Sequence, residues 1–559
     1  MSKAKTSATP ESVYAARPWL NHYNFWVPAH MNYPRRPLHE ILRQTAAEVP
    51  DRPATAFLGK HLTFREIKEQ SDKFVYALSR LGVKQGDRVG VMLPNCPQYL
   101  ISTFALFRLG VTVVNVNPIY TAREVLVVAK DSEMCALVTL NALAPLVLGV
   151  LEQTSIKSVI VSSLEEYSAA ATPCTDVAGA LRLADLLSCV ERPNLPSVTI
   201  DTDEDVAVLQ YTGGTTGVPK GAMLTHANIF ANVVQTEVWA NRDTRRGEDR
   251  YLLVIPFFHI YGFTVGMLEG IWRGAQQILI PKYDVEVVLS AIRDYEPTYF
   301  PAVPTIYISL LNHPKATEYG IDRIRHFNSG SAPLPLEVIE QFERLTGGTL
   351  AEGYGLSEAS PVTHSTPSLG KRKPGSIGLP LSDTDIKIVD LEVGSREVPI
   401  GEEGELCIAG PQVMKGYFNK PEETKIALRK DEAGRTWLYT GDVARMDDDG
   451  YTYIVQRKKD LILVSGFNVY PSEVEGVLYS HDAVMEAAVI GVPDSYRGES
   501  VKAFVVLKPG AETTVDELIA HCETGLAEFK VPKQLVFRDS LPKTAVGKIL
   551  HRVLREAVA

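Results

Sequence analysis

The chain has 559 residues, of which 45% are hydrophobic and 22% charged, as in an ordinary globular protein of more than one domain. It carries 57 lysines and arginines against 67 aspartates and glutamates, a formal net charge of −10. This acidic excess argues against a nucleic-acid-binding protein. The six cysteines form no CxxC pair, so neither a zinc framework nor a disulfide scaffold is predicted, and a reducing cytoplasm is the expected compartment.

Two uncharged, strongly apolar stretches need to be weighed as membrane spans. Residues 135–151 are too short for a comfortable span and include Asn141 and Pro145, so they predict a buried strand followed by a helix. Residues 251–268 are interrupted by Pro256, His259 and two glycines. The N-terminus lacks the apolar core of a signal peptide. We expect no transmembrane segment, and peripheral contact with the inner face of the membrane stays open.

Strand-like and helical segments alternate over the first 370 residues. A strand at 88–93 is followed by a helix at 98–109 and a strand at 111–116. Further strands are predicted at 206–210, 251–255 and 277–280. Strand–helix–strand succession predicts a parallel sheet with right-handed crossovers.

The pattern changes after about residue 370. Short strands at 375–377, 385–389 and 404–408, separated by glycine, proline and acidic turns, predict a β-rich subdomain or barrel over about 370–456. The charged run Arg457–Asp460 between two apolar strands predicts a linker. We therefore place an N-terminal domain at 1–456 and a C-terminal domain at 457–559.

The segment at 211–221 reads YTGGTTGVPKG and lies between a predicted strand and a helix at 225–235. Its glycines let backbone N–H groups approach phosphate oxygens, its threonines add hydroxyl donors, and its lysine adds a positive charge. Lys220 lies between Pro219 and Gly221, which excludes a Walker A loop, and no GxGxxG occurs. The candidate phosphate-binding residues are Thr212, Gly213, Gly214, Thr215, Thr216, Gly217 and Lys220.

Six more segments accompany this loop along the chain. They are 256–262 (PFFHIYG), 328–333 (NSGSAP), 352–358 (EGYGLSE), 439–442 (YTGD), 457–475 and 542–548 (PKTAVGK). In these motifs and their order the chain resembles the adenylate-forming superfamily, and within it the acyl-CoA synthetases. The resemblance implies an α/β fold: a large N-terminal domain of stacked αβαβα sheets with a β-barrel subdomain, and a small mobile α+β C-terminal domain. Gly213 departs from the family, where Ser or Thr is frequent, so the loop has one hydroxyl fewer.

The resemblance also implies a role for each motif residue. Tyr354 stacks on adenine, Glu358 and Thr216 bind Mg²⁺, and Asp442 accepts both ribose hydroxyls with Arg457 beside it. Without the resemblance, Glu358 reads as a solvated charge and Asp442 as a turn or cap residue. The remaining expected nucleotide-binding residues are Gly330, Ser331, Ala332, Glu352, Gly353, Gly355 and Ser357.

Two half-reactions are implied. In the first, Lys548 stabilises the charge that grows as a carboxylate attacks the α-phosphate of ATP to give acyl-AMP. In the second, a thiol passes Gly466 and His259 and displaces AMP. Since Lys548 and Gly466 lie in one C-terminal segment but serve different steps, the domain is expected to rotate about a hinge near Lys459.

The substrate follows only from resemblance to bacterial long-chain fatty acid–CoA ligases. The acyl pocket is expected around 261–267, 302–304 and 329–332, where Gly262 and Gly266 leave space and no carboxylate lies within 261–267 to hold an amino acid. ATP, Mg²⁺, CoA and a medium- to long-chain fatty acid are therefore expected, with a homodimer suggested by family habit. A 4-coumarate-like aromatic acid ligase and an acyl-AMP ligase feeding a carrier protein stay open. A non-catalytic nucleotide-binding protein is disfavoured because Lys548, Glu358 and Asp442 are present.

Overall fold

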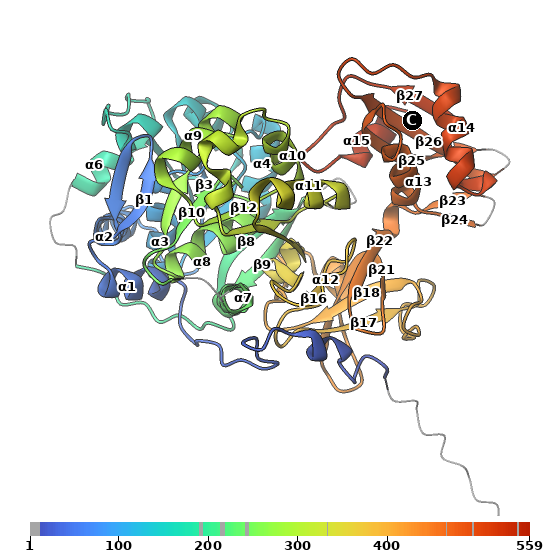
Figure 1. The fold of residues 1–559 in the computed structure, drawn as a ribbon. Coiled ribbons are helices and arrows are strands. Elements are labelled where there is room, and N and C mark those ends of the chain that lie inside the picture. Colours follow the sequence, from blue (N-terminus) through green and yellow to red (C-terminus); the bar gives the residue numbers. More distant parts are fainter. Residues whose placement is uncertain are drawn as a thin grey trace, which may run out of the picture. The chain divides into compact units, whose positions relative to one another are not determined.

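The computed structural model describes residues 12–188, 194–212, 219–240, 245–332, 334–464, 467–494, 497–544 and 547–558. Its helices and sheets confirm the predicted α/β fold (Figure 1). The chain divides into two compact units. The larger unit comprises Trp19–Asp385 and Ile408–Leu438, and the smaller unit comprises Met1–Pro18, Ile386–Cys407 and Tyr439–Ala559.

The first large sheet carries the predicted phosphate loop. Its eight strands follow the order β19-β9-β8-β4-β3-β5-β6-β7, and the strands from β8 to β7 pair in parallel, as predicted. The antiparallel strands β9 and β19 extend the sheet beyond β8. The bounds are β3 Arg88–Met92, β4 Thr112–Asn115, β5 Ala136–Leu140, β6 Ser158–Ser162, β7 Leu181–Arg182, β8 Val206–Thr212, β9 Lys220–Thr225 and β19 Gly416–Tyr417.

The second large sheet carries the predicted adenine-binding strand, β14. Its order is β16-β15-β14-β13-β12-β10-β11-β1-β2, with parallel pairing from β14 to β1 and antiparallel strands at both edges. The bounds are β1 Pro53–Phe57, β2 Lys60–Thr63, β10 Arg250–Leu253, β11 Gln276–Leu279, β12 Tyr299–Ala302, β13 His326–Ser329, β14 Thr349–Gly355, β15 Val362–Ser365 and β16 Leu379–Pro380.

The helix α3 (Pro97–Leu109) is buried on every side, with Arg108 the one residue that is not buried. It packs on α2 (Phe64–Arg80) and on strands β3 and β4 of the first sheet. Rings of α3 also meet Phe263, which follows β10 of the second sheet, since Tyr99 and Phe107 lie 6.4 and 6.2 Å from it between ring centroids. A helix that is buried and mostly apolar on all sides belongs in a core, and this one forms part of the core between the two large sheets.

Capping residues explain where several helices begin. In α7 (His226–Trp239), the Thr225 hydroxyl accepts from the Asn228 N–H at 3.2 Å, and the Asn228 side chain accepts from the Thr225 N–H at 3.0 Å. Such reciprocal bonds satisfy two backbone donors at a helix start. The other main helices of the larger unit are α1 His39–Glu48, α4 Ala122–Ser132, α9 Val285–Tyr295, α10 Pro304–Leu311 and α11 Leu336–Thr346.

The predicted β-rich stretch forms a five-stranded sheet in the order β17-β18-β21-β20, with β22 paired to β21. The bounds are β17 Asp385–Val389, β18 Gly404–Ala409, β20 Leu428–Lys430, β21 Thr436–Met446 and β22 Thr452–Arg457. The strand expected at 375–377 is wrong: Gly375 has φ +74° in a turn, and the nearest strand is β16. The short Gly-Ser-Ile segment between turn residues suggested a strand, but the left-handed glycine breaks it.

The tail is a small α+β assembly, drawn in red in Figure 1. Its sheet follows the order β24-β23-β26-β25, with β27 paired to β26, and α13 and α15 pack on β25. The bounds are β23 Ile462–Val464, β24 Phe467–Val469, α13 Pro471–Tyr479, β25 Val484–Asp494, β26 Gly498–Leu507, α14 Val515–Gly525, β27 Gln534–Phe537 and α15 His551–Glu556.

The predicted linker is a short 3-10 turn, Lys458–Asp460, directly after β22. Residues 439–456 belong to the same compact unit as the tail, whereas the predicted boundary between the two domains lies at 456/457. The boundary at 456/457 separates the part that is expected to rotate, and it stays a prediction.

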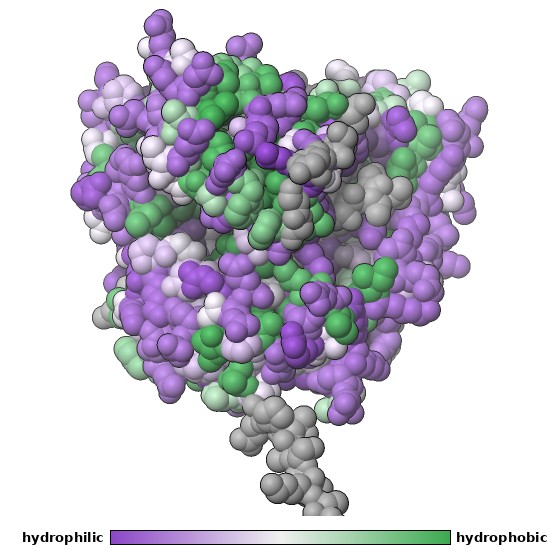
Figure 2. Space-filling model, turned by 90° about the vertical axis from the view of Figure 1, so that its right-hand side faces the viewer, coloured by the Kyte–Doolittle hydropathy of each residue, from purple (hydrophilic) through white to green (hydrophobic). Residues whose placement is uncertain are grey.

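No helix among the described residues is long and apolar enough to cross a membrane. On the face drawn in Figure 2, hydrophilic residues predominate and apolar residues form groups between them.

Candidate active site

The ends of the phosphate loop are held together by a hairpin. β8 and β9 pair antiparallel with Thr212 opposite Lys220, so strand, loop, strand and helix follow one another, rather than the predicted loop running straight to the helix. Gly213, Gly214, Thr215, Thr216 and Gly217 lie outside the described residues. The pairing places the Thr212 and Lys220 backbones side by side at the mouth of the loop.

A half-buried network fixes the residue that precedes this loop, and sequence reasoning missed it. The Tyr211 hydroxyl donates to Asp131 Oδ2 on α4 at 2.8 Å, and Lys420 Nζ pairs with Asp131 Oδ1 at 3.1 Å. Burial, followed by the bond to Asp131, raises the pKa of Tyr211 far above its usual value, so the phenol stays a donor. No motif links the three residues, which lie far apart in the chain.

Glu358, the predicted Mg²⁺ ligand, lies in the 3-10 turn Ser357–Ala359 that follows β14. Its Oε1 accepts from the Tyr417 hydroxyl at 2.7 Å, and none of the described residues forms an ion pair with it. Lys220 Nζ lies over the same Tyr417 ring, 5.3 Å from the centroid. The described residues hold no cluster of three metal-binding side chains, but Mg²⁺ on a nucleotide typically takes one or two carboxylates plus phosphate oxygens, so Glu358 fits that ion.

The strand β14 presents Glu352, Gly353, Tyr354 and Gly355 in sequence. Tyr354 stands opposite His364 of β15, and their rings meet edge to face at 5.8 Å. Burial lowers the pKa of His364 to about 3, so its imidazole is neutral at physiological pH. His364 therefore supports one side of the ring that is expected to stack on adenine.

The two glycines of β14 differ in how closely they are packed. A Cβ on Gly355 would lie 2.2 Å from the carbonyl oxygen of Pro361, whereas on Gly353 the nearest atom would be 3.7 Å away. Gly355 is thus required by close approach of the chain. At Gly353 a Cβ would fit, so close packing does not require a glycine there.

Glu352 is held in an environment that disfavours its charge. Burial raises the pKa of its carboxyl to about 7, against the lowering effects of the Leu334 N–H, which donates to Oε1 at 3.4 Å, and of Arg372. The site therefore contains a carboxyl that titrates near neutrality, on the same strand as Tyr354.

His259 lies just before a π-helix, Gly262–Leu268, whose residues are all buried. Its Nδ1 accepts from the Tyr261 N–H at 3.3 Å, and the preceding Phe258 carbonyl accepts from Gln210 of β8 at 3.1 Å. The His259 segment is therefore tied to the strand that leads into the phosphate loop. π-helical turns often occur at functional sites.

The expectation that Gly262 and Gly266 leave space for an acyl chain is wrong. A Cβ on Gly262 would lie 2.4 Å from the Pro256 carbonyl oxygen, and on Gly266 it would lie 3.1 Å from Leu253. The missing side chains admit neighbouring protein atoms instead of substrate. The sequence could not distinguish these two uses of a glycine.

The segment Gly330–Ala332 follows β13, and Ser331 has φ +71°. A Cβ on Gly330 would contact the Tyr261 ring at 3.1 Å, and the Tyr261 hydroxyl donates to Asn328 Oδ1 at 2.5 Å. The structure thereby brings together two stretches of the expected acyl pocket, 261–267 and 329–332.

In the smaller unit, Asp442 and Arg457 stand opposite each other on β21 and β22. Arg457 Nε lies 2.7 Å from Asp442 Oδ1, and the Asp442 side chain is only 3% exposed. A buried carboxylate is stable only with such a partner. Gly466 lies outside the described residues, between β23 and β24, whose ends Val464 and Phe467 pair antiparallel.

The charges of Arg457 and Asp442 influence the pKa values of both Lys548 and Lys459. Atoms crowded around the amine and the cations Arg457 and Lys459 lower the pKa of Lys548 to about 8, and Asp442 and Asp460 oppose this. By surface area the residue is exposed, so solvent weakens the effect of crowding. Burial also lowers the pKa of Lys459, with Asp460 opposing. The smaller unit therefore gathers four predicted residues into one charged cluster: Asp442, Arg457, Lys459 and Lys548.

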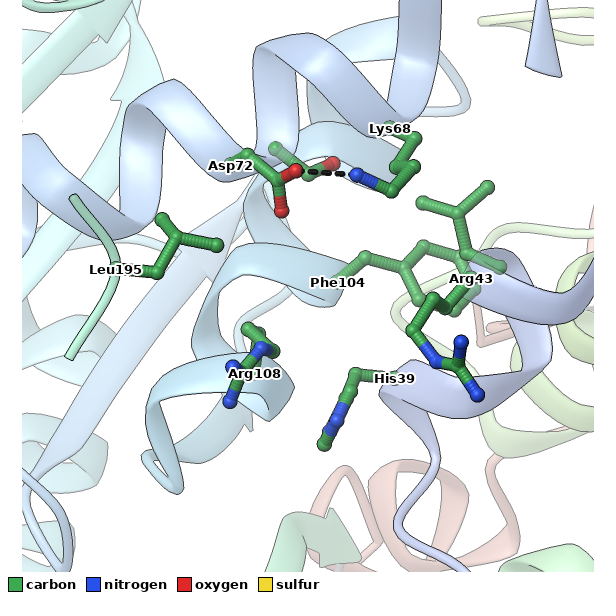
Figure 3. A pocket seen from close by; sticks show the side chains of 9 residues that line it. His39, Arg43, Lys68, Asp72, Phe104, Arg108 and Leu195 are labelled. Atoms are coloured by element: carbon green, nitrogen blue, oxygen red, sulfur yellow. Dashed lines mark hydrogen bonds and ion pairs between the residues drawn. The ribbon is translucent and has the colours of Figure 1, made fainter. Parts of the chain in front are cut away.

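A separate cavity of about 160 Å³ lies where α1, α2 and α3 meet, and none of the predicted site residues lines it (Figure 3). Lys68 and Asp72 face each other across 2.5 Å at its edge, and Arg43, another lining residue, pairs with Glu40. Burial and the nearby Arg108 lower the pKa of His39 to about 4, so that ring is neutral. Most of the charged side chains that line this cavity are therefore already paired with another charged side chain of the protein.

Residues 42–418 match the family model of the AMP-binding enzymes, and residues 473–548 match that of the AMP-binding enzyme C-terminal domain. A long-chain-fatty-acid–CoA ligase of Bacillus subtilis (strain 168) is 46% identical, over 97% of this chain and 98% of that protein. One of Salmonella typhimurium is 39% identical, over 96% and 98%.

Among solved structures, ATP-bound MatB from Rhodopseudomonas palustris superposes with a TM-score of 0.82 at 29% identity, over 93% of this chain and 99% of that chain. The match of the family model to more than half of the chain and the near-complete coverage of the relatives agree with the order of the motifs described above. The chain belongs to the AMP-binding enzyme family.

Proposed function

We propose that this protein activates a fatty acid with ATP and transfers the acyl group to CoA, giving acyl-CoA and AMP. The observation that carries the proposal is the 46% identity, over almost the whole chain, to a long-chain-fatty-acid–CoA ligase. Two features of the described residues support the same reaction: the Glu358 carboxylate has no cationic partner among them, and Lys548 belongs to the charged cluster with Asp442, Arg457 and Lys459.

In the first half-reaction, a carboxylate oxygen of the acid attacks the α-phosphorus of ATP, and the bond to pyrophosphate breaks. Glu358 and Thr216 would hold Mg²⁺, which supplies charge neutralisation at the phosphates. Lys220 attracts the phosphate chain, and Tyr354 offers its ring to adenine. Lys548, when protonated, stabilises the negative charge that develops on the attacked phosphate.

In the second half-reaction, the thiol sulfur of CoA attacks the acyl carbon, and AMP leaves through its phosphate oxygen. Asp442, which pairs with Arg457, is proposed to accept hydrogen bonds from the ribose hydroxyls. Gly466 and His259 are proposed to border the path of the thiol, with rotation of residues 457–559 about Lys459 between the two steps.

CoA-dependent AMP release over a panel of short- to long-chain fatty acids and cinnamates tests this proposal. We expect turnover that rises with chain length, since each buried methylene contributes about 0.8 kcal/mol. Turnover with cinnamates and with no fatty acid would establish the aromatic alternative instead. Accumulation of acyl-AMP without thioester would establish the carrier-protein alternative.

We further propose a cytoplasmic location, with a homodimer and peripheral contact with the inner membrane face as the assemblies to test. Light scattering of the purified protein measures the first, and co-sedimentation with vesicles measures the second. A monomer that stays in the supernatant would contradict both assemblies without affecting the proposed reaction.

A further inference from the structure

Tyr417 lies between the two charged residues of the candidate phosphate site. Its hydroxyl donates to Glu358 Oε1 at 2.7 Å, and its ring lies under Lys220 Nζ at 5.3 Å. The three residues come from separate stretches of the chain, the turn after β14, the strand β19 and the start of β9. A single side chain therefore contacts both the predicted metal ligand and the predicted phosphate-binding lysine.

The backbone of Tyr417 is anchored independently of its side chain. It pairs with Ala222 of β9, the Phe418 N–H donates to the Gly221 carbonyl at 2.8 Å, and Lys420 is tied to Asp131. The Met414 N–H also donates to the Glu358 carbonyl at 2.8 Å. These bonds do not involve the Tyr417 hydroxyl, so its loss would leave them in place.

Without a fixed partner, a glutamate side chain distributes over several rotamers. One hydrogen bond to Oε1 selects an orientation and leaves Oε2 without a hydrogen-bond partner among the described residues. Mg²⁺ demands near-ideal octahedral geometry, so it gains from a carboxylate that is held before it binds. The Tyr417 ring adds an attraction for Lys220 through its electron-rich face.

We propose that Tyr417 is a positioning residue of the nucleotide site: its hydroxyl fixes the Glu358 carboxylate for Mg²⁺-bound ATP, and its ring holds Lys220. The inference rests on the proposed function because it takes the site to bind Mg²⁺ and ATP. It assigns to Tyr417 a role that its position in a Gly-Tyr pair does not reveal.

Tyr417→Phe tests the hydroxyl while keeping the ring for Lys220. In calorimetric titrations of the full chain, we expect Mg²⁺-bound ATP to bind about tenfold more weakly than to the original protein, the loss expected when a group that orients a metal ligand is removed. Binding of ATP with EDTA present should be unchanged, and the variant should still unfold in one cooperative transition, lowered by no more than a few degrees. Tyr453→Phe, which removes a hydroxyl bonded to Asp447 Oδ2 at 3.1 Å, is the matched control and should leave both titrations unchanged.

A double-mutant cycle distinguishes positioning from a general structural effect. In a Glu358→Gln background, the added Tyr417→Phe change should weaken binding of Mg²⁺-bound ATP by less than about twofold. The proposal would be overturned if the two substitutions lowered the affinity for Mg²⁺-bound ATP by independent factors that multiply in the double variant. It would also be overturned if Mg²⁺ strengthened ATP binding as much in Tyr417→Phe as in the original protein. These titrations need no acid substrate, so a protein that binds Mg²⁺-bound ATP but activates no fatty acid would refute the proposed function and leave the role of Tyr417 standing.

Discussion

Lys548 and Asp442 take their chemistry from their surroundings. A lysine in a turn is ordinarily a solvated cation, yet at Lys548 crowding and the neighbouring Arg457 and Lys459 bring the pKa to about 8. An aspartate buried to 3% exposure is tolerable because Arg457 lies 2.7 Å away. The motifs predicted which residues matter, and the contacts explain the state in which each is held.

Lys548→Ala should lower the rate of acyl-AMP formation at least about 100-fold, the loss expected when one group that stabilises the transition state is removed. Thioester formation from supplied acyl-AMP should remain close to that of the original enzyme. Each half-reaction is measured separately, by pyrophosphate release and by CoA consumption. Lys543→Ala is the control, because Lys543 lies in the same turn but pairs with Glu486. Equal loss in both half-reactions would refute the assigned role.

The pH dependence of the first half-reaction follows from the same lysine. The active form is protonated, and a pKa of about 8 means that this form is lost as pH rises through 8. We expect acyl-AMP formation to be constant below about pH 7 and to fall about tenfold per pH unit above 8. Lys548→Arg should remove this fall, since a guanidinium stays charged. A decline that persists in the Lys548→Arg variant would assign the titration to another group.

At the scale of elements, strand pairing brings together residues that lie far apart in the sequence. β8 and β9 bring Thr212 opposite Lys220, and β19, almost 200 residues later in the chain, adds Tyr417 to the same sheet. β14 and β15 likewise place Tyr354 opposite His364. The positions of strands β3, β8, β17 and β18 were predicted well, because alternating and continuous apolar runs report burial directly.

Gly355→Ala tests the close packing at the end of β14. A Cβ there would lie 2.2 Å from the Pro361 carbonyl oxygen, so the strand must shift at a cost of about 1–3 kcal/mol of unfolding free energy. Gly353→Ala on the same strand meets nothing closer than 3.7 Å and is the matched control. Chemical denaturation of the two variants measures the difference. Equal stabilities would show that β14 has room at both positions.

At the scale of the whole molecule, the proposed reaction is expected to use two arrangements of one chain. The predicted hinge, Lys459, lies in the short turn between β22 and β23, where few residues would have to change backbone conformation. Both the long N-terminal stretch and the tail match family models of the AMP-binding enzymes. The hinge itself, like the domain boundary, stays a prediction.

Lys459→Pro tests the hinge by fixing its φ near −65°. We expect one half-reaction to stay within about threefold of the original rate and the other to fall at least tenfold, because the tail is held in one arrangement. Stopped-flow measurements of acyl-AMP formation and of thioester formation provide the two rates. With Lys459→Ala, which keeps the backbone free, the two half-reactions should change together. Parallel losses in Lys459→Pro would place the hinge elsewhere.

The sequence by itself determined the α/β class, the order of the motifs and the family, because apolar periodicity and short glycine-containing motifs are local signals. It could not determine what a glycine makes room for: Gly262 and Gly266 admit Pro256 and Leu253 rather than substrate. Nor could it reveal that Tyr417 contacts Glu358, or that Asp131 joins Tyr211 to Lys420. Only the tertiary structure decided these, since contacts between distant residues depend on how strands pair and leave no local pattern in the chain.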